Sequence, residues 1–479
     1  MWIKNSINIA KAKALIRLGV LARLSGRYSP RNWDEVSRTG WRWAWPNVQP
    51  ETPGRGGLRV LIVGGYGYQN VGDEAQLGAN LERWRQRVPG CEITVLSPHP
   101  AYTSKTHEVR SEFASRVVWF DANRRNDYAQ SNRRFQKEYW KVRRRMVASA
   151  HCLRAGIPLL FCLPDETRLL ALIQQADVLH LSGGGYMTGM TRSRLWDHCL
   201  LIELCHLLGT PVIMTGQTIG VFRSRADRRL AKQALKPVRA ITLRDHGRSE
   251  ADVRALGVRA SRVQSTHDDA LFCGTAPAEA VAAAVRQAGL DPDMPFIAAN
   301  FHYWGLSSEQ KEAAAVRFAQ LSDHLGTVSN APVLFVPMVP GDEQPERDVM
   351  ARMHCRTAML EYAYDYRLAR GVLGAASLVF TMKHHPIIFA YGEGVPVAAV
   401  ALDPYYHQKN RGAMELFEQG EYCMDEEVFF SETGAQMLSR LWAVRRNEAG
   451  TIQSHVERLR PQDGRVIQSF MNGLADHAE

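Results

Sequence analysis

Residues 58–74, Leu-Arg-Val-Leu-Ile-Val-Gly-Gly-Tyr-Gly-Tyr-Gln-Asn-Val-Gly-Asp-Glu, place an apolar run directly before a glycine-rich turn. Glycines in such a turn lack the Cβ atom that keeps a backbone away from a ligand. Asp73 stands where it can cap the following predicted helix, so the turn lies at the positive end of the helix dipole. A strand, a glycine turn and a helix in this order predict the mouth of a parallel α/β sheet, where an anion is stabilised.

Apolar strand-like runs alternate with helical ones along most of the chain. Strands are predicted at 178–181, 212–214 and 241–243, with a helix at 195–208 between the first two. The same alternation repeats after a linker near 277–295. This pattern is typical of βαβ units around a parallel sheet. We therefore predict an α/β protein with two tandem Rossmann-like domains that face a shared cleft.

The predicted organisation has four parts. Residues 1–55 form a basic N-terminal extension, and residues 56–276 form the first Rossmann-like domain with a basic insertion at about 121–165. Residues 290–445 form the second Rossmann-like domain, and residues 446–479 form a helical tail. The length of 479 residues agrees with this division, because single cores rarely exceed about 250–300 residues.

Composition excludes two classes of protein. A hydrophobic fraction of 45% and a charged fraction of 23% are ordinary for a globular protein, and no apolar run of about 20 residues predicts a membrane span. The eight cysteines form no C-x-x-C pair, which argues against a disulfide framework and against a zinc site. Reduced thiols of this kind predict a cytoplasmic protein.

The net charge of +10 is concentrated in two segments. The N-terminus carries no acidic residue before Asp34, and the 121–165 insertion carries nine Arg or Lys residues between Arg124 and Arg145. Peripheral contact with an anionic membrane, at the inner face of the membrane, is one interpretation. A solvated extension and a solvated helical excursion are the alternatives. Nucleic acid is not an expected partner.

Two further glycine turns follow strands of the first domain. Residues 182–185, Ser-Gly-Gly-Gly, follow one strand, and residues 215–220, Thr-Gly-Gln-Thr-Ile-Gly, follow the next. Three such turns at strand ends predict a cradle of backbone donors around one site. The binding residues predicted in the three turns are Gly65, Tyr66, Asn70, Gly72, Asp73, Ser182, Gly183, Gly184, Gly185, Gln217 and Gly220.

Charged residues end two more strands of the first domain. Arg244 follows Ile241-Thr242-Leu243, where its planar guanidinium can hold a carboxylate or phosphate at two points. An exposed strand-end arginine paired with Asp245 is the structural alternative. Asp268 and Asp269, which close a further short strand, can orient Arg244 or start a turn.

In the second domain, Lys383, His384 and His385 stand between a buried strand and an apolar helix. Imidazole exchanges protons near neutral pH, and lysine supplies a positive charge. Adjacent histidines rarely bind one metal ion, so we predict no metal site. Asn300 and the neighbouring His302 follow another strand of this domain, where they can line the opposite wall.

Five motifs, in this order, resemble the polysaccharide pyruvyl transferase family. They are Gly-Tyr-Gly-Tyr-Gln-Asn-Val-Gly-Asp-Glu, Ser-Gly-Gly-Gly, Gly-Gln-Thr-Ile-Gly, Thr-Leu-Arg-Asp, and Met-Lys-His-His-Pro-Ile-Ile-Phe-Ala followed by Gly-Val-Pro-Val. The resemblance spans about residues 58–425. It implies a fold like that of GT-B glycosyltransferases and transfer of a pyruvyl group from phosphoenolpyruvate to a sugar, commonly as a cyclic ketal.

The resemblance also implies roles for individual residues. Arg244 matches an arginine that holds the anionic groups of the donor, and His385 matches a histidine that transfers protons. Lys383 stands where the family usually has arginine, which keeps the charge but loses the bidentate fork. Lys409 is a predicted binding residue, and the stretch 402–410 that leads to it is longer than is usual in the family.

The sequence therefore predicts a pyruvyl transferase that uses phosphoenolpyruvate as donor substrate and needs no cofactor. Its acceptor is expected to be a sugar of a cell-envelope polysaccharide or glycan precursor, lipid-linked or nucleotide-activated. Two other functions stay open at this stage. One is a GT-B glycosyltransferase that uses a nucleotide sugar, and the other is a catalytically silent protein that binds sugars or anions.

Overall fold

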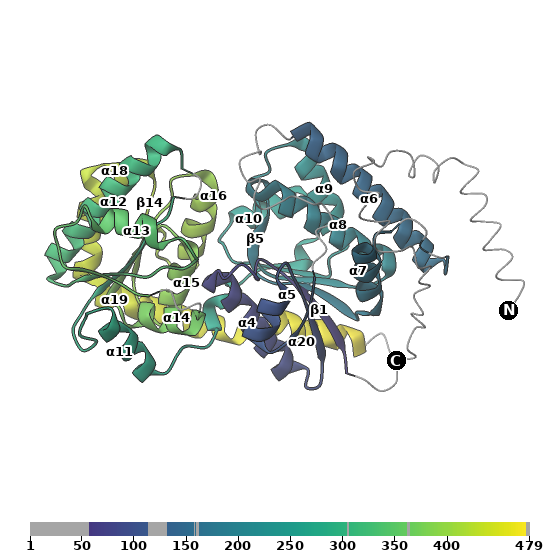
Figure 1. Cartoon of the computed structure of the whole chain (residues 1–479), viewed down its shortest axis with the longest axis horizontal. Coiled ribbons are helices and arrows are strands. Elements are labelled where there is room, and N and C mark those ends of the chain that lie inside the picture. The colour runs from purple at the N-terminus through teal and green to yellow at the C-terminus, as the bar shows by residue number, and fades with distance from the viewer. Residues whose placement is uncertain are drawn as a thin grey trace, which may run out of the picture.

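The structure is a computed structural model, and it describes residues 57–113, 132–157, 159, 162–303, 306–361 and 365–475. Two parallel sheets, each covered by helices, lie side by side (Figure 1). The strand ends of both sheets meet between them. The structure confirms the predicted α/β class with two Rossmann-like domains. The predicted N-terminal extension lies outside the described residues.

The first sheet has eight strands, with β3-β2-β1-β4-β6-β7-β8 in order and β5 beside β6. All of its pairings are parallel. The strands are β1 (Arg59–Val63), β2 (Glu92–Ser97), β3 (Arg110–Phe113), β4 (Val178–Leu181), β5 (Gly184–Thr188), β6 (Val212–Gly220), β7 (Ala240–Leu243) and β8 (Val263–Ser265). The helices of this domain are α4 (Val71–Arg87), α5 (Pro100–His107), α6 (Asn132–Arg154), α7 (Pro164–Gln175), α8 (Arg192–Leu208), α9 (Arg225–Leu235) and α10 (Arg248–Ala255).

The second sheet has six parallel strands in the order β11-β10-β9-β12-β13-β14. Its strands are β9 (Ile297–Asn300), β10 (Val333–Phe335), β11 (Thr357–Met359), β12 (Leu378–Thr381), β13 (Val397–Val400) and β14 (Cys423–Met424). Its helices are α11 (Ala278–Gln287), α12 (Ser308–Ser329), α13 (Glu343–Met350), α14 (Tyr366–Ala375), α15 (His384–Gly392), α16 (Pro404–Tyr406), α17 (Gly412–Glu415), α18 (Glu426–Phe430) and the long α19 (Glu432–Leu459).

The third predicted glycine turn is strand in the structure. Residues 215–220 continue β6 to Gly220, and all nine residues of the strand are buried. Gly216 has a φ of +55°, and the register against β7 shifts between Met214 and Gln217. Because glycine accepts this backbone angle, the strand forms a bulge there and continues instead of ending.

Helix α4 belongs to the hydrophobic cores of both domains. Asn70 caps it by accepting a hydrogen bond from Gly72 N at 3.1 Å. One side of α4 packs Leu77 and Trp84 into the first domain. Ala75 and Ala79 pack into the core of the second domain. The helix that starts at the first glycine turn is therefore fixed by both halves of the molecule.

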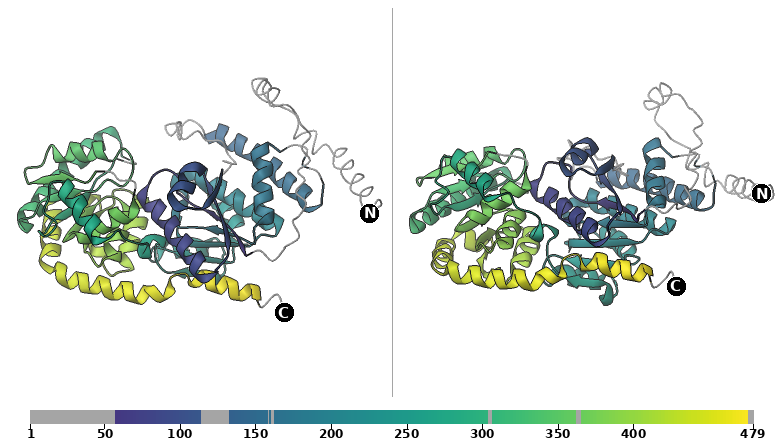
Figure 2. Two further views of the ribbon diagram at one scale, coloured as in Figure 1. Left: turned by 60° about the horizontal axis from the view of Figure 1, so that its bottom comes forward. Right: turned by 90° about the horizontal axis from the view of Figure 1, so that it is seen from below.

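The C-terminal segment connects the two domains along one side of the molecule (Figure 2). Helix α19 packs Leu438, Leu441 and Val456 into the second domain, and the boundary predicted at 445/446 falls inside this unbroken helix. Helix α20 (Arg465–Ala475) then packs Ile467 against the first domain. Between the two helices, Asp463 forms an ion pair with Arg83 Nε at 2.5 Å.

The basic insertion contains α6, which is packed rather than solvated. Phe135 and Tyr139 are buried against Trp196 of α8, with ring centroids 5.0 and 4.6 Å away. Arg143 pairs with Glu203, and Arg145 pairs with Glu166. Two of the insertion's basic residues are thus paired with acidic residues of the domain on which it lies.

None of the helices in the described part of the chain is long and apolar enough to cross a bilayer. All eight cysteines are free thiols. Within the described residues, no three His, Cys, Asp or Glu side chains are grouped as metal ligands.

Replacing Asp463 with alanine tests whether the C-terminal segment fastens the domains. Arg83 is buried and keeps its contacts with Asn80 and Asp269, so the loss of its Nε partner should lower the free energy of unfolding by about 1–3 kcal/mol in urea titrations. Glu457→Ala on exposed α19 surface is the control and should change it by less than about 0.5 kcal/mol. Equal stability of the two variants would show that the ion pair does not hold the segment.

Candidate active site

The carboxylate of Asp268 is the centre of the polar network between the two sheets. It accepts hydrogen bonds from Arg244 Nη1 at 2.6 Å, Gln76 Nε2 at 2.9 Å and His384 Nε2 at 3.2 Å. Asp268 and Arg244 are each only 1% exposed. Arg244 directly follows β7, Gln76 lies in α4 and His384 lies in the second domain, so one buried carboxylate connects three parts of the fold.

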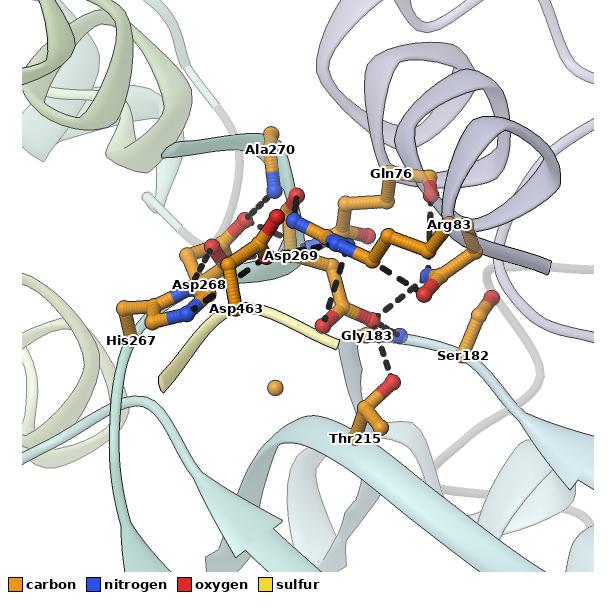
Figure 3. Close-up of polar contacts among 12 residues, drawn as sticks. Gln76, Arg83, Ser182, Gly183, Thr215, His267, Asp268, Asp269, Ala270 and Asp463 are labelled. Atoms are coloured by element: carbon orange, nitrogen blue, oxygen red, sulfur yellow. Dashed lines mark hydrogen bonds and ion pairs between the residues drawn. The ribbon is translucent and has the colours of Figure 1, made fainter. Parts of the chain in front are cut away.

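The neighbouring Asp269 anchors this arrangement to the first sheet (Figure 3). Its Oδ2 accepts hydrogen bonds from Gly183 N at 2.7 Å and Thr215 Oγ1 at 2.6 Å. Asn80 of α4 donates to the same oxygen at 2.7 Å. The N–H group of the second glycine turn is therefore used within the protein.

The two predicted histidines lie in the first turn of α15, and they face the first domain. A Cβ atom on Gly72 would lie 2.0 Å from Cγ of His385, so only glycine admits the ring at this contact. His385 Nε2 and His384 Nδ1 are buried, and neither atom has a hydrogen-bond partner among the described residues. Two unpaired imidazole nitrogens inside a polar site indicate a place for a ligand.

Lys383 precedes these histidines as the N-cap residue of α15. Its Nζ donates to Asp342 Oδ2. The same carboxylate accepts backbone hydrogen bonds from Met338 and Val339 at 2.9 and 3.1 Å. Met338 in turn accepts a hydrogen bond from the backbone of Val71 at 3.1 Å. Lys383 is thus held at the junction of α4 with the second domain.

Lys409 completes the cationic side of the site. Its Nζ lies 5.5 Å from the ring centroid of Tyr405 and 5.8 Å from that of Tyr406. A Cβ atom on Gly185 would lie 2.1 Å from the Tyr405 hydroxyl, so Gly185 admits this tyrosine. The first two glycine turns therefore receive side chains of the second domain, which closes the cleft over the site.

Electrostatics separates the charged groups from the neutral ones. Burial and the positive charge of Arg244 lower the pKa of His384 to about 3, and burial lowers that of His385 well below its usual value, so both are neutral at pH 7. Burial raises the pKa of Asp268, but Arg244 and His384 lower it further, so the net shift is well below the usual value.

The charges of Asp73 and Lys409 act on each other in the site. Burial raises the pKa of Asp73 to about 6, against the charges of Lys409 and Arg194. Burial and Arg244 lower the pKa of Lys409 to about 7. Both groups therefore titrate close to neutral pH.

Several predicted binding residues act within the fold in this conformation. Gln217 donates to the Ser182 carbonyl and the Tyr186 hydroxyl, and Asn300 donates to Val336 and Glu346. Gly65, Gly184 and Gly220 leave room for the side chains of Asp73, Tyr186 and Asp252, while Ser182 and Tyr66 lie together beside Gly64. The prediction that glycine-turn amides hold an anion stays a prediction.

The sequence did not single out Gln76, Asn80, Arg83 or Asp342 as site residues. Gln76, Asn80 and Arg83 recur at positions 76, 80 and 83 of α4, a spacing that places polar side chains on one face of a helix. This shared helix face was the available indication. Asp342 follows no such pattern, and only the tertiary structure brings it to Lys383.

The family comparison agrees with this geometry. The family model described as "Polysaccharide pyruvyl transferase" matches residues 70–404, a range that contains Arg244, Asp268, Lys383 and His385. The chain belongs to the polysaccharide pyruvyl transferase family. This is a family of transferases. No protein of curated function matches the chain significantly in sequence.

Solved structures with the GT-B fold are similar to this family member. HepE from Anabaena in complex with UDP-glucose has a TM-score of 0.50 and 15% identity, and the match covers 88% of this chain and 100% of that one. MnaA from S. aureus in complex with UDP has a TM-score of 0.52 and 10% identity, covering 87% and 97% of the two chains. At these identities the likeness shows the fold.

Gly72→Ala tests the closed contact between the domains. The added methyl group would displace His385, so we expect a larger radius of gyration by small-angle X-ray scattering and a lower melting temperature. Gly450→Ala is the matched control, since a Cβ there meets nothing within 4 Å in the middle of α19. It should stabilise the protein by about 0.5–1 kcal/mol. Unchanged scattering in Gly72→Ala would mean that the contact does not govern closure.

The raised pKa of Asp73 predicts a pH dependence of stability. The folded protein keeps a proton on this carboxyl up to about pH 6, whereas the unfolded chain loses it near pH 4. As the pH rises from about 4 to about 6, the free energy of unfolding should therefore decrease. The contribution of this group to the decrease is roughly 1–2 kcal/mol. Urea titrations of Asp73→Asn should lack this decrease, and those of the exposed control Glu427→Gln should retain it.

Proposed function

We propose that the protein transfers a pyruvyl group from phosphoenolpyruvate to a sugar hydroxyl of a cell-envelope polysaccharide or glycan precursor. The observation that carries this proposal is the unpaired, buried Nε2 of His385, in a site that also contains Arg244, Lys383 and Lys409. The cations would attract a strongly anionic donor, and the neutral imidazole of His385 could accept a proton beside it. Membership of the family supports the donor.

Arg244 is the residue that we assign to the donor's anionic groups. Its Nε donates to Thr218 at 2.9 Å and its Nη1 to Asp268, while Nη2 has no acceptor among the described residues. The fixed guanidinium can therefore offer Nη2 to a phosphate or carboxylate without reorienting. Lys383 and Lys409 add point charges, which lower the repulsion between the donor and an incoming hydroxyl oxygen.

His385 is the residue that we assign to proton transfer. Its neutral imidazole takes the proton of the sugar hydroxyl and passes it to the methylene carbon of the donor. The hydroxyl oxygen bonds to the central carbon, and the bond from that carbon to the phosphate oxygen then breaks. A second hydroxyl of the sugar closes the ketal and loses its proton as phosphate leaves. Such acid–base help is typically worth about 10²–10⁴ in rate.

The proposal includes two features of substrate use. The site residues are buried between the domains, so substrates enter when the domains separate and react when they close. The scheme uses fixed cations and side chains of the protein, and it assigns no cofactor beyond the donor substrate. The acceptor is a lipid-linked or nucleotide-activated sugar.

The test is phosphate release from phosphoenolpyruvate by the purified protein, with and without a panel of lipid-linked and nucleotide-activated sugars. His385→Ala should lower acceptor-dependent release by at least about 100-fold. The matched control is His354→Ala, an exposed histidine of the same domain, which should release phosphate at the wild-type rate. Near-wild-type turnover by His385→Ala would exclude the proton-transfer role.

Arg244→Lys tests whether the several N–H donors of the guanidinium are needed, because the substitution removes them but retains a positive charge beside Asp268. We expect a higher KM for phosphoenolpyruvate, because lysine cannot contact Asp268, Thr218 and the donor together. Circular dichroism should show the wild-type fold. If the wild-type protein releases no phosphate but consumes UDP-glucose in the presence of acceptor, the donor is a nucleotide sugar and the proposed function is wrong.

A further inference from the structure

The outer face of α9 carries a line of cations that the sequence motifs did not indicate. Arg225, Arg229, Lys232 and Lys236 are exposed, and they recur at intervals of four, three and four residues. At 3.6 residues per turn these positions share one face of the helix and its last turn. We call these four residues the α9 stripe.

The opposite face of α9 fixes the stripe's orientation. Leu230, Ala234 and Leu235 are buried, and α9 packs on α8. The only acidic residue of the helix, Asp227, is also buried, where it binds Arg192 and Trp196 of α8 at 2.8 and 2.7 Å. The negative charge of α9 is therefore directed inward, and all of its outward charge is positive.

The stripe differs from the basic faces of α6 and α10 in having no acidic partner. On α6, Lys141 pairs with Glu138 and Arg143 with Glu203. On α10, Arg254 pairs with Glu250. The side chains of the stripe form no hydrogen bond or ion pair with any residue that the structure describes. We do not count the neighbouring Arg228 as part of the stripe, because it lies near an acidic residue. Burial raises the pKa of Asp252, and the positive charge of Arg228 acts against this increase.

We propose that the α9 stripe is a docking surface for an anionic lipid membrane. A straight row of cations on a convex helix can contact a flat anionic surface along its whole length. The row contains no aromatic residue for stacking on bases, which favours a membrane over single-stranded nucleic acid. Each basic residue near such a surface strengthens binding about fivefold.

Docking through α9 would bring the cleft close to the membrane. Strand β6 ends at Gly220 beside the second domain, where Gln408 donates to the Ile219 carbonyl at 3.0 Å. Arg225, the first residue of the stripe, is five residues after Gly220, so the Cα atoms of these two residues are at most about 18 Å apart. A sugar carried on a membrane lipid could reach the site from this surface. That consequence rests on the proposed function, whereas membrane binding does not.

The test is co-sedimentation of the full-length protein with vesicles of phosphatidylcholine containing about 30% phosphatidylserine, in about 0.1 M salt. The triple variant Arg225→Gln, Arg229→Gln, Lys232→Gln should lower the partition coefficient about 100-fold. Pure phosphatidylcholine should bind neither protein. Phosphate release with a soluble acceptor should stay unchanged in the variant, since none of the three residues lies in the site.

The control removes the same charge from the second domain, through Arg347→Gln, Arg446→Gln and Arg458→Gln, which are exposed there. It should bind vesicles within about twofold of the wild type. An equal loss in both triple variants would attribute binding to net charge and overturn the proposal. So would failure of the wild type to bind anionic vesicles, or α9-dependent binding to duplex DNA in place of vesicles.

Discussion

The buried carboxylate of Asp268 is the interaction on which the rest of the site depends. A charge that is removed from water is stable only if enough donors surround it. Here the donors come from β7, α4 and α15, so the need to satisfy one carboxylate fixes two domains relative to each other. The same carboxylate thereby orients Arg244 and His384 between the two domains.

Glycine makes this closeness possible. Gly72 and Gly185 lie where side chains of the second domain enter the first, and a Cβ atom at either position would overlap with His385 or Tyr405. The glycine turns thus make room for side chains of the second domain, which their sequence pattern does not predict. A pattern typical of a backbone cradle for anions instead leaves room, in this structure, for two side chains of the second domain. The C-terminal helices hold the same two domains from the other side.

The cations of the site are balanced within the protein. Arg244 contacts Asp268, Lys383 contacts Asp342, and Lys409 is coupled to Asp73. Such pairing lowers the free energy of burying positive charge while the site is closed. It also means that any anionic ligand of these groups would have to compete with carboxylates for them. The lysine at position 383, where the family usually has arginine, is placed by this pairing with Asp342.

The sequence by itself determined the fold class and most of the strands, because alternating apolar runs and glycine turns admit few arrangements other than parallel sheets. It also indicated Arg244, Asp268, Lys383 and His385, since polar residues directly after buried strands must lie at the carboxyl edge of a sheet. It pointed to Asp269 but could not show its partners Gly183, Thr215 and Asn80, and it could not identify Asp342, whose partner Lys383 is distant in the chain. Nor could it distinguish the paired cations of α6 from the unpaired ones of α9. Ion pairing depends on which helix lies opposite, and only the tertiary structure decides that.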